Sequence, residues 1–285
     1  MKQRIGAHQS TSGGYHKALE SINTKGGNCL QIFSSSPFTW SPAQVDKKTT
    51  EKFTALKNEL KIRPVYFHAL YLVNLADPGI TGQKSVAALT HELELAARLE
   101  VVGSIVHTGS FKNKDKTVSC RDEQYYPTLL KNIKKVLSET PDNTLLILEN
   151  AGNRKIGQTI DQLAEIVEDV NDPRVRICLD TCHLHAAGYD LVSMEQFESF
   201  LDDFEKKIGL NKLEVIHMND SRDKLNDLRD RHENIGEGFV GRDVFKNFLN
   251  HPKTCHIPFI IETPGFDSKG PDKENIDILK SLITQ

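Results

Sequence analysis

Val175-Arg-Ile-Cys-Leu-Asp180 is a short apolar run that ends in a residue able to bind a metal ion. Runs of this length, rich in apolar and β-branched residues, are typical of buried β-strands. Five further runs share the pattern and end in His68, His107, Glu149, His217 and Glu262. Parallel α/β folds build their active sites at the carboxyl ends of strands, so the pattern predicts both a fold and a site.

Ordinary solvated strand caps are the alternative interpretation of this pattern, because polar residues favour strand ends. Asp and Glu together number 39 and His numbers 11 among the 285 residues. A given position therefore carries one of these residue types less than one time in five. Composition alone rarely fills six of eight strand ends, so we favour a functional site.

Two further apolar runs, Arg4–His8 and Cys29–Phe33, complete a set of eight predicted strands. Their ends lie 25 to 45 residues apart, enough for one crossover helix each. Capping-box patterns at Thr159 and Ser193 support two of these helices, and the first is expected to begin at Ile160. The sequence predicts one domain, residues 1–285, folded as an α/β eight-stranded barrel. An open doubly wound sheet is the competing architecture, but its strands diverge and rarely gather ligands at one point.

Composition excludes several protein classes. No run is long enough to span a membrane, and the N-terminus has no apolar signal core. Five cysteines, an odd number without a CxxC pair, favour reduced thiols and a cytoplasmic protein. The formal net charge of −3 says little about an anionic partner, because bound cations would change it.

Two loop motifs add three potential ligands to the six at the strand ends. In Asp180-Thr-Cys-His183 the histidine is expected in a loop, and in Asp230-Arg-His232 alternation places both side chains on one side. Nine ligands are too many for one ion and suit about three catalytic ions with open positions. Ligation by nitrogen and oxygen favours Zn²⁺ or Mn²⁺, and cysteine ligands are not needed.

Five motifs that span nearly the whole chain are similar to those of one known family. They are Gly6-Ala-His8, His68-x-x-Tyr71-Leu-Val-Asn-Leu75, Leu179-Asp-Thr-Cys-His183, His217-Met-Asn-Asp-Ser221 and Asp230-Arg-His-Glu-Asn-Ile-Gly-Glu-Gly238. In this respect the chain resembles endonuclease IV, a metal-dependent abasic-site endonuclease family with a xylose-isomerase-like TIM barrel.

The resemblance implies a DNA repair endonuclease that hydrolyses the phosphodiester bond 5′ to an abasic site in duplex DNA and leaves a 3′-hydroxyl. It also implies removal of 3′-blocking groups, and a trinuclear zinc mechanism with a metal-bound hydroxide as nucleophile. Glu149 and Glu262 would be the catalytic carboxylates, and the protein would act as a monomer. The implied ligand groups are His68, His107 and Glu149; then Glu149, Asp180, His217 and Glu262; then His183, Asp230 and His232.

Four residues are expected to contact DNA: three follow from the resemblance, and His8 follows from its place at the end of the first predicted strand. Phe38 stands where many members carry an Arg, and it is expected to wedge into the base stack; packing under Trp40 is the alternative. Tyr71 and Leu72 match the family's intercalating pair, with local packing as the alternative. His8 is expected to contact phosphate or, equally, to make a structural hydrogen bond.

Two other functions remain open at the level of sequence. A sugar isomerase or epimerase on a similar barrel would use acidic residues and His around one or two ions, without the group of His183, Asp230 and His232. A non-catalytic metal-binding or nucleic-acid-binding module is less consistent with the residues, because structural zinc sites are closed and usually rich in cysteine.

Overall fold

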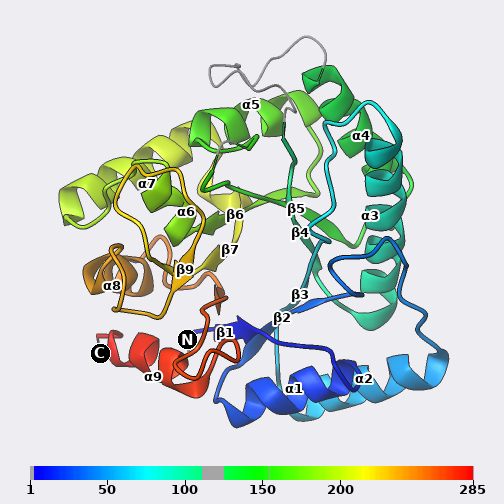
Figure 1. The fold of residues 1–285 in the computed structure, drawn as a ribbon, viewed down its shortest axis with the longest axis horizontal. Helices are drawn as coiled ribbons and strands as arrows, with labels where there is room; N and C mark the ends of the chain where they lie inside the picture. Colours follow the sequence, from blue (N-terminus) through cyan, green and yellow to red (C-terminus); the bar gives the residue numbers. More distant parts are fainter. Residues whose placement is uncertain (1–2, 111–124, 154, 285) are drawn as a thin grey trace.

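Eight parallel strands close into a barrel in the computed structural model, which describes residues 3–110, 125–153 and 155–284 (Figure 1). Their order around the barrel follows the chain, and the last strand pairs with the first. The closed barrel confirms the predicted fold and excludes the open sheet. The strands are β1 (Ile5–His8), β2 (Cys29–Phe33), β3 (Val65–His68), β4 (Gly103–His107), β5 (Leu145–Glu149), β6 (Val175–Asp180), β7 (Leu213–His217) and β10 (Phe259–Ile261).

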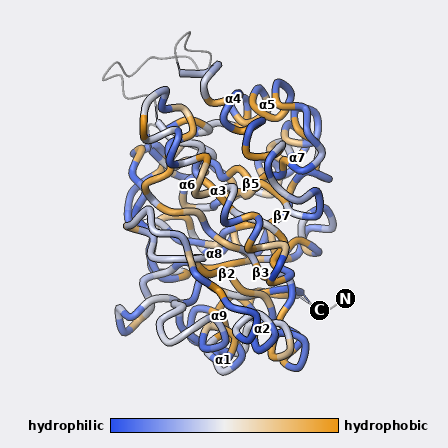
Figure 2. The backbone as a smooth tube through the Cα atoms, turned by 90° about the vertical axis from the view of Figure 1, so that its right-hand side faces the viewer, coloured by the Kyte–Doolittle hydropathy of each residue, from blue (hydrophilic) through white to orange (hydrophobic). Residues whose placement is uncertain are grey.

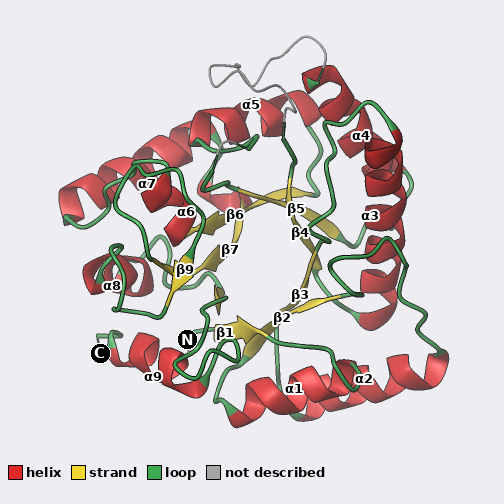
Figure 3. Cartoon of the chain, viewed as in Figure 1, coloured by secondary structure: helices red, strands yellow, loops and turns green. Residues whose placement is uncertain are grey.

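Helices follow the strands and form the outer ring, which is seen end-on in Figure 3. Side-chain caps start two of them as predicted: Thr159 accepts a hydrogen bond from the Gln162 backbone N–H, and Ser193 accepts one from the Gln196 backbone N–H. The helices are α1 (Tyr15–Thr24), α2 (Lys47–Glu59), α3 (Ile80–Leu99), α4 (Tyr126–Ser138), α5 (Ile160–Val170), α6 (Thr181–Ala186), α7 (Met194–Lys207), α8 (Arg242–Asn250) and α9 (Lys273–Ser281), with a 3₁₀ turn, η1 (Leu210–Lys212).

Two features of the loops differ from the sequence prediction. His183 lies in α6 and not in a loop, because Asp180 caps this helix directly after β6: its carboxylate accepts a hydrogen bond from the His183 backbone N–H. A short antiparallel hairpin of β8 (Asp220–Ser221) and β9 (His232–Glu233) was not predicted at all. Strands of two residues have no detectable periodicity, so nothing in the sequence pattern indicated them.

An apolar layer fills the inside of the barrel. One inward-facing residue from each of seven strands forms a buried cluster, separate from the larger core between strands and helices. Gly6 of β1 contributes no side chain there, since a Cβ atom would lie 1.9 Å from the Cys29 carbonyl oxygen. Figure 2 shows the hydrophobic strands in the middle of the molecule and hydrophilic stretches on the outside. The members of the apolar layer are Cys29, Tyr66, Ile105, Ile147, Cys178, Val215 and Ile260.

The described residues are consistent with two expectations from composition. Cys29, Cys178, Cys182 and Cys255 are all free thiols, while Cys120 lies outside the described residues. None of the described helices has the length and apolar character that crossing a membrane would require.

Candidate metal centre

A polar layer lies directly above the apolar layer of the barrel. Side chains alternate between the two faces of a strand, so the residue two positions after each member of the apolar layer also faces inward. On β3 to β7 this residue is one of the predicted strand-end ligands. The sixth such ligand, Glu262, comes directly after Ile261, the last residue of β10. The inward layer therefore explains why the ligand types occur where they do.

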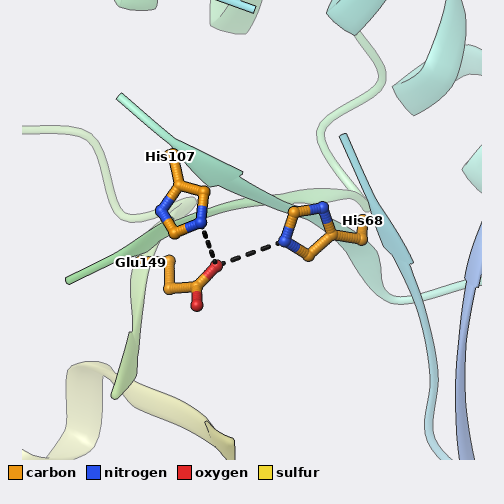
Figure 4. A group of neighbouring side chains, drawn as sticks. All are labelled: His68, His107 and Glu149. Atoms are coloured by element: carbon orange, nitrogen blue, oxygen red, sulfur yellow. Dashed lines mark hydrogen bonds and ion pairs between the residues drawn. The ribbon is translucent and has the colours of Figure 1, made fainter. Parts of the chain in front are cut away.

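His68, His107 and Glu149 form the first group of potential ligands. The two imidazoles point at the same carboxylate oxygen (Figure 4). His68 Nε2 lies 3.2 Å and His107 Nε2 lies 3.5 Å from Glu149 Oε2. All three side chains come from neighbouring strands, β3, β4 and β5.

Glu149 also belongs to a second group, with Asp180, His217 and Glu262. His217 Nδ1 lies 3.2 Å from Glu149 Oε1, 3.4 Å from Glu262 Oε2 and 3.8 Å from Asp180 Oδ2. The two oxygens of Glu149 therefore face different groups. A carboxylate in this position is able to bridge two cations.

His183, Asp230 and His232 form the third group. Asp230 Oδ1 lies 3.0 Å from His183 Nε2 and 3.5 Å from His232 Nε2. His232 Nε2 is also 3.5 Å from Asp180 Oδ2, which joins this group to the second one. The structure thus brings all nine predicted ligands into one cluster; their role as ligands stays a prediction.

Local structure holds the third group in place. The Asn150 carbonyl oxygen lies 2.9 Å from His183 Nδ1, which leaves Nε2 directed at Asp230. Gly152 allows this close approach, because a Cβ atom there would lie 2.6 Å from His183 Cδ2. The β8–β9 hairpin positions His232.

Protons occupy the cluster when no cation is present. Burial raises the pKa of Glu149, but His107 and His217 beside it lower it well below its ordinary value. Burial likewise raises the pKa of Glu262, and His217 and His68 lower it to about 2. For His183 burial lowers the pKa, but Asp180 and Asp230 raise it well above its ordinary value. Ionised Glu149 and Glu262 therefore share the cluster with His183, which retains a proton that a cation would displace. Burial lowers the pKa of His107 to about 4, so this imidazole is neutral without a cation.

Two observations show that the residues fit metal ions. The Nε2 atoms of His183 and His232 are buried and make no hydrogen bond of acceptable geometry to any described residue, although carboxylate oxygens lie near them. Buried polar atoms of this kind are rare unless a ligand satisfies them. The donors are imidazoles and carboxylates, a set suited to Zn²⁺ or Mn²⁺.

Two thiols lie near the cluster. Cys178 is close to Glu149 and His217, and Cys182 is close to Asp180 and His232. Burial raises the pKa of each thiol to about 12, so both remain protonated at neutral pH. The three groups of imidazoles and carboxylates form without these thiols, so the expectation that cysteine ligands are not needed stays a prediction.

The third group and part of the first open into a cavity of about 430 Å³ at the mouth of the barrel. His8 and Tyr71 also line this cavity, so both lie beside the predicted ligands. Leu72 lines an adjoining cavity of about 290 Å³ with Tyr71. The mouth therefore has room for a substrate next to the cluster.

Phe38 and Tyr71 form an exposed aromatic pair beside the mouth. The side chains are 71% and 59% exposed, and their ring centroids are 5.5 Å apart. Trp40, under which Phe38 was alternatively expected to pack, lies partly buried against the core with Lys84 Nζ over its ring. Phe38 is therefore free to contact a large partner at the mouth.

Three buried amides around the cluster were not predicted as site residues. Gln31 hydrogen-bonds with His217 and Glu262, Asn219 with Asp180 and the Glu262 backbone, and Asn150 with the Asp180 backbone. Of these three amides, only Gln31 had a signal in the sequence, and that signal was weak. Gln31 is a polar residue at an inward position of the apolar run Cys29–Phe33, two residues after Cys29 of the apolar layer.

Comparisons with known proteins agree on the family. Residues 19–282 match a family model described as a xylose isomerase-like TIM barrel. The chain is 36% identical over 284 residues to a protein named probable endonuclease 4 from Halothermothrix orenii, with 97% of this chain and 99% of that relative covered. A protein of the same name from Aquifex aeolicus is 34% identical over 282 residues, with 98% of this chain and 97% of that relative covered.

Solved structures show the same relationship. The crystal structure of endonuclease IV from Thermus thermophilus matches with a TM-score of 0.84 and 32% identity, covering 98% of both chains. A D-tagatose 3-epimerase-like protein matches with a TM-score of 0.70 and 20% identity, covering 98% of this chain and 96% of its own. That second likeness concerns the fold alone.

Proposed function

Because the chain belongs to the endonuclease IV family of xylose isomerase-like TIM barrels, we propose that it is a DNA repair endonuclease acting at abasic sites. It would hydrolyse the phosphodiester bond on the 5′ side of the site in duplex DNA and leave a 3′-hydroxyl. Removal of 3′-blocking groups would use the same centre. The proposal treats residues 1–285 as one domain that acts as a monomer.

The third ligand group is the observation that carries this proposal. His183, Asp230 and His232 meet from α6, a loop and β9, and two of the three atoms involved are buried without a hydrogen bond among the described residues. A sugar isomerase or epimerase with one or two ions has no need of this group. We infer that the nine residues hold three Zn²⁺ ions, with Glu149 shared between the first and second.

The residues of the centre have distinct roles in this mechanism. When bound, clustered cations supply positive charge that neutralises a phosphodiester and favours the ionisation of water near neutral pH. Glu149 presents one oxygen to each of two groups and would keep them at a fixed separation. Glu262 stays ionised because its pKa is about 2, so its carboxylate would accept a hydrogen bond from the attacking water, orient it and steer its proton.

His8 would contact the substrate directly. It lines the cavity, and burial lowers its pKa to about 4, so the imidazole is neutral at physiological pH. A neutral imidazole is able to donate one hydrogen bond to a phosphate oxygen. Phe38, Tyr71 and Leu72 would enter the duplex beside the abasic site, where a missing base lowers the energy needed to separate the stack.

Incision of a defined duplex tests the proposal. The protein with Zn²⁺ is incubated with a duplex that carries one abasic site, and the same sequence without damage serves as the control substrate. We expect one nick, 5′ to the site, whose 3′ end a polymerase extends. Glu262→Gln is expected to lose roughly 100-fold or more of this activity, the scale of a positioned acid or base.

Glu59→Gln is the matched control variant, because Glu59 is an exposed residue at the end of α2. It is expected to cut like the wild type. Each protein is also incubated with a ketose and Mn²⁺. Turnover of the sugar, with no nick in the abasic duplex, would contradict the proposal and favour an isomerase or epimerase.

A further inference from the structure

Gln31 occupies a special place in the polar layer of the barrel. On β3 to β7 and beyond β10, the inward position above the apolar layer carries a carboxylate or an imidazole, and on β1 it carries His8. On β2 the corresponding residue is Gln31, which is completely buried. A neutral amide thus stands where the other strands have groups that ionise.

The carboxamide of Gln31 joins three residues of the site. Its oxygen lies 2.7 Å from His217 Nε2, and its nitrogen lies 2.5 Å from Glu262 Oε1 and 2.9 Å from His8 Nδ1. The nitrogen has two hydrogens to donate and the oxygen accepts, so all of these contacts are satisfied at once. The opposite orientation would place the amide oxygen against the Glu262 carboxylate, and is therefore excluded.

These contacts determine which ring nitrogen of His217 carries a hydrogen and which one faces the second ligand group. Because the amide oxygen accepts from Nε2, this nitrogen must carry a hydrogen. The other nitrogen, Nδ1, is the one that faces Glu149, Glu262 and Asp180 at 3.2 to 3.8 Å. An imidazole with its hydrogen on Nε2 has its lone pair on Nδ1, where a cation would bind.

We propose that Gln31 is a positioning residue that selects the metal-binding tautomer of His217 and holds the Glu262 carboxylate in the second ligand group. The inference rests on the proposed function, since it assumes a metal ion at that group. An apolar side chain would leave a buried N–H without a partner. A carboxylate would keep the acceptor for His217 but would place a second negative charge against Glu262.

Zinc binding to three variants tests this role. Gln31→Met keeps the length of the side chain and removes both the acceptor and the donors. Gln31→Glu keeps the acceptor alone. Gln9→Met is the matched control, because Gln9 is another buried glutamine. Its amide contacts Ser21, Lys25 and the backbone carbonyls of His8 and Pro271, and no predicted ligand.

Two readouts that need no DNA are measured on each protein. The first is Zn²⁺ affinity in competition with a chelator, and the second is the ¹⁵N-bound proton signal of His217 Nε2 in the zinc-loaded protein. Loss of a partner that orients a ligand typically weakens metal binding roughly 10- to 100-fold. We expect this loss and a fast-exchanging Nε2 proton in Gln31→Met, and neither in Gln9→Met.

Gln31→Glu is expected to retain a protected Nε2 proton, since the carboxylate still accepts from it. The proposal is overturned if Gln31→Met binds zinc as tightly as Gln9→Met, or if its His217 signal is unchanged. If Gln31→Met does not fold, Gln31→Glu provides the test by itself. Absence of the protected His217 Nε2 proton in Gln31→Glu would then overturn the proposal. A wild type that binds zinc through this network but does not incise DNA would contradict only the proposed function.

Discussion

Asp180 shows how one residue serves both the fold and the site. One carboxylate oxygen accepts from the His183 backbone N–H and so starts α6 at the end of β6. The other accepts a 2.7 Å hydrogen bond from Asn219 Nδ2 and lies 3.5 Å from His232 Nε2. The residue that begins the helix therefore also connects the second ligand group to the third.

Glu92 is a buried carboxyl outside the ligand cluster, and it predicts a pH dependence of stability. It accepts hydrogen bonds from the Ser34 and Ser104 hydroxyls, and burial raises its pKa to about 7 from an ordinary 4.5. Between these values the folded protein binds more protons than the unfolded chain, so the free energy of unfolding falls as pH rises through this window. The shift corresponds to about 3 kcal/mol.

Glu92→Gln removes this titration while keeping the size of the side chain. Urea unfolding of the metal-free wild type and variant is measured at pH 5 and pH 8. We expect the loss of stability between these pH values to be about 2 to 3 kcal/mol larger in the wild type. Equal losses in both proteins would show that Glu92 does not retain its proton.

The exposed side chain of Phe38 is predicted to contribute to the affinity for abasic duplex DNA. Phe38→Ala is expected to weaken binding to an abasic duplex about fivefold or more, the lower end of what a base–aromatic contact contributes. The zinc content should not change, because Phe38 is exposed and lies outside the ligand groups. Met194→Ala, an exposed side chain on α7, is the control. An unchanged dissociation constant in a fluorescence titration would argue against the wedge.

At the scale of elements, the contact between α6 and the loop after β5 determines the third ligand group. Gly152→Ala would add a Cβ atom 2.6 Å from His183 Cδ2 and 3.0 Å from His183 Cα. We expect the variant to displace His183 and to bind about one ion fewer than the wild type, because three protein ligands typically hold one catalytic ion. Elemental analysis measures this, and an unchanged ion content would mean that α6 tolerates the shift.

The sequence predicted the eight strands well, and in six of them two signals coincide. An apolar run such as Leu145–Glu149 is buried on both faces, and the ligand at its end follows the inward alternation. The same alternation predicts that the side chain of Gln31 faces the inside of the barrel. An amide is not a typical metal ligand, so the pattern of ligands at strand ends did not include this residue.

The remaining differences come from interactions that a linear pattern does not contain. The position of His183 depends on Asp180 acting as a helix cap, and the β8–β9 hairpin depends on pairing between segments 11 residues apart. Asn219 acts through contacts with Asp180 and Glu262, which only the closed barrel brings together. Motifs predicted the candidate ligands, whereas the residues that contact them could only be found in the structure.

At the scale of the whole molecule, closing the barrel produces the site. Predicted ligands from six strands, α6, a loop and the hairpin converge on one mouth, next to a cavity of about 430 Å³. The formal net charge of −3 gives no hint of this, because the charge of the site depends on the cations that it would hold.

The number of ions per chain shows directly whether the nine predicted ligands form one trinuclear centre. The purified wild type and His232→Ala are each loaded with Zn²⁺, and the mass of each protein is measured by native mass spectrometry. We predict about three ions on the wild type and about two on the variant, since each catalytic ion needs about three protein ligands. Two ions or fewer on the wild type, or the same number on both proteins, would show that the nine residues do not form a trinuclear centre.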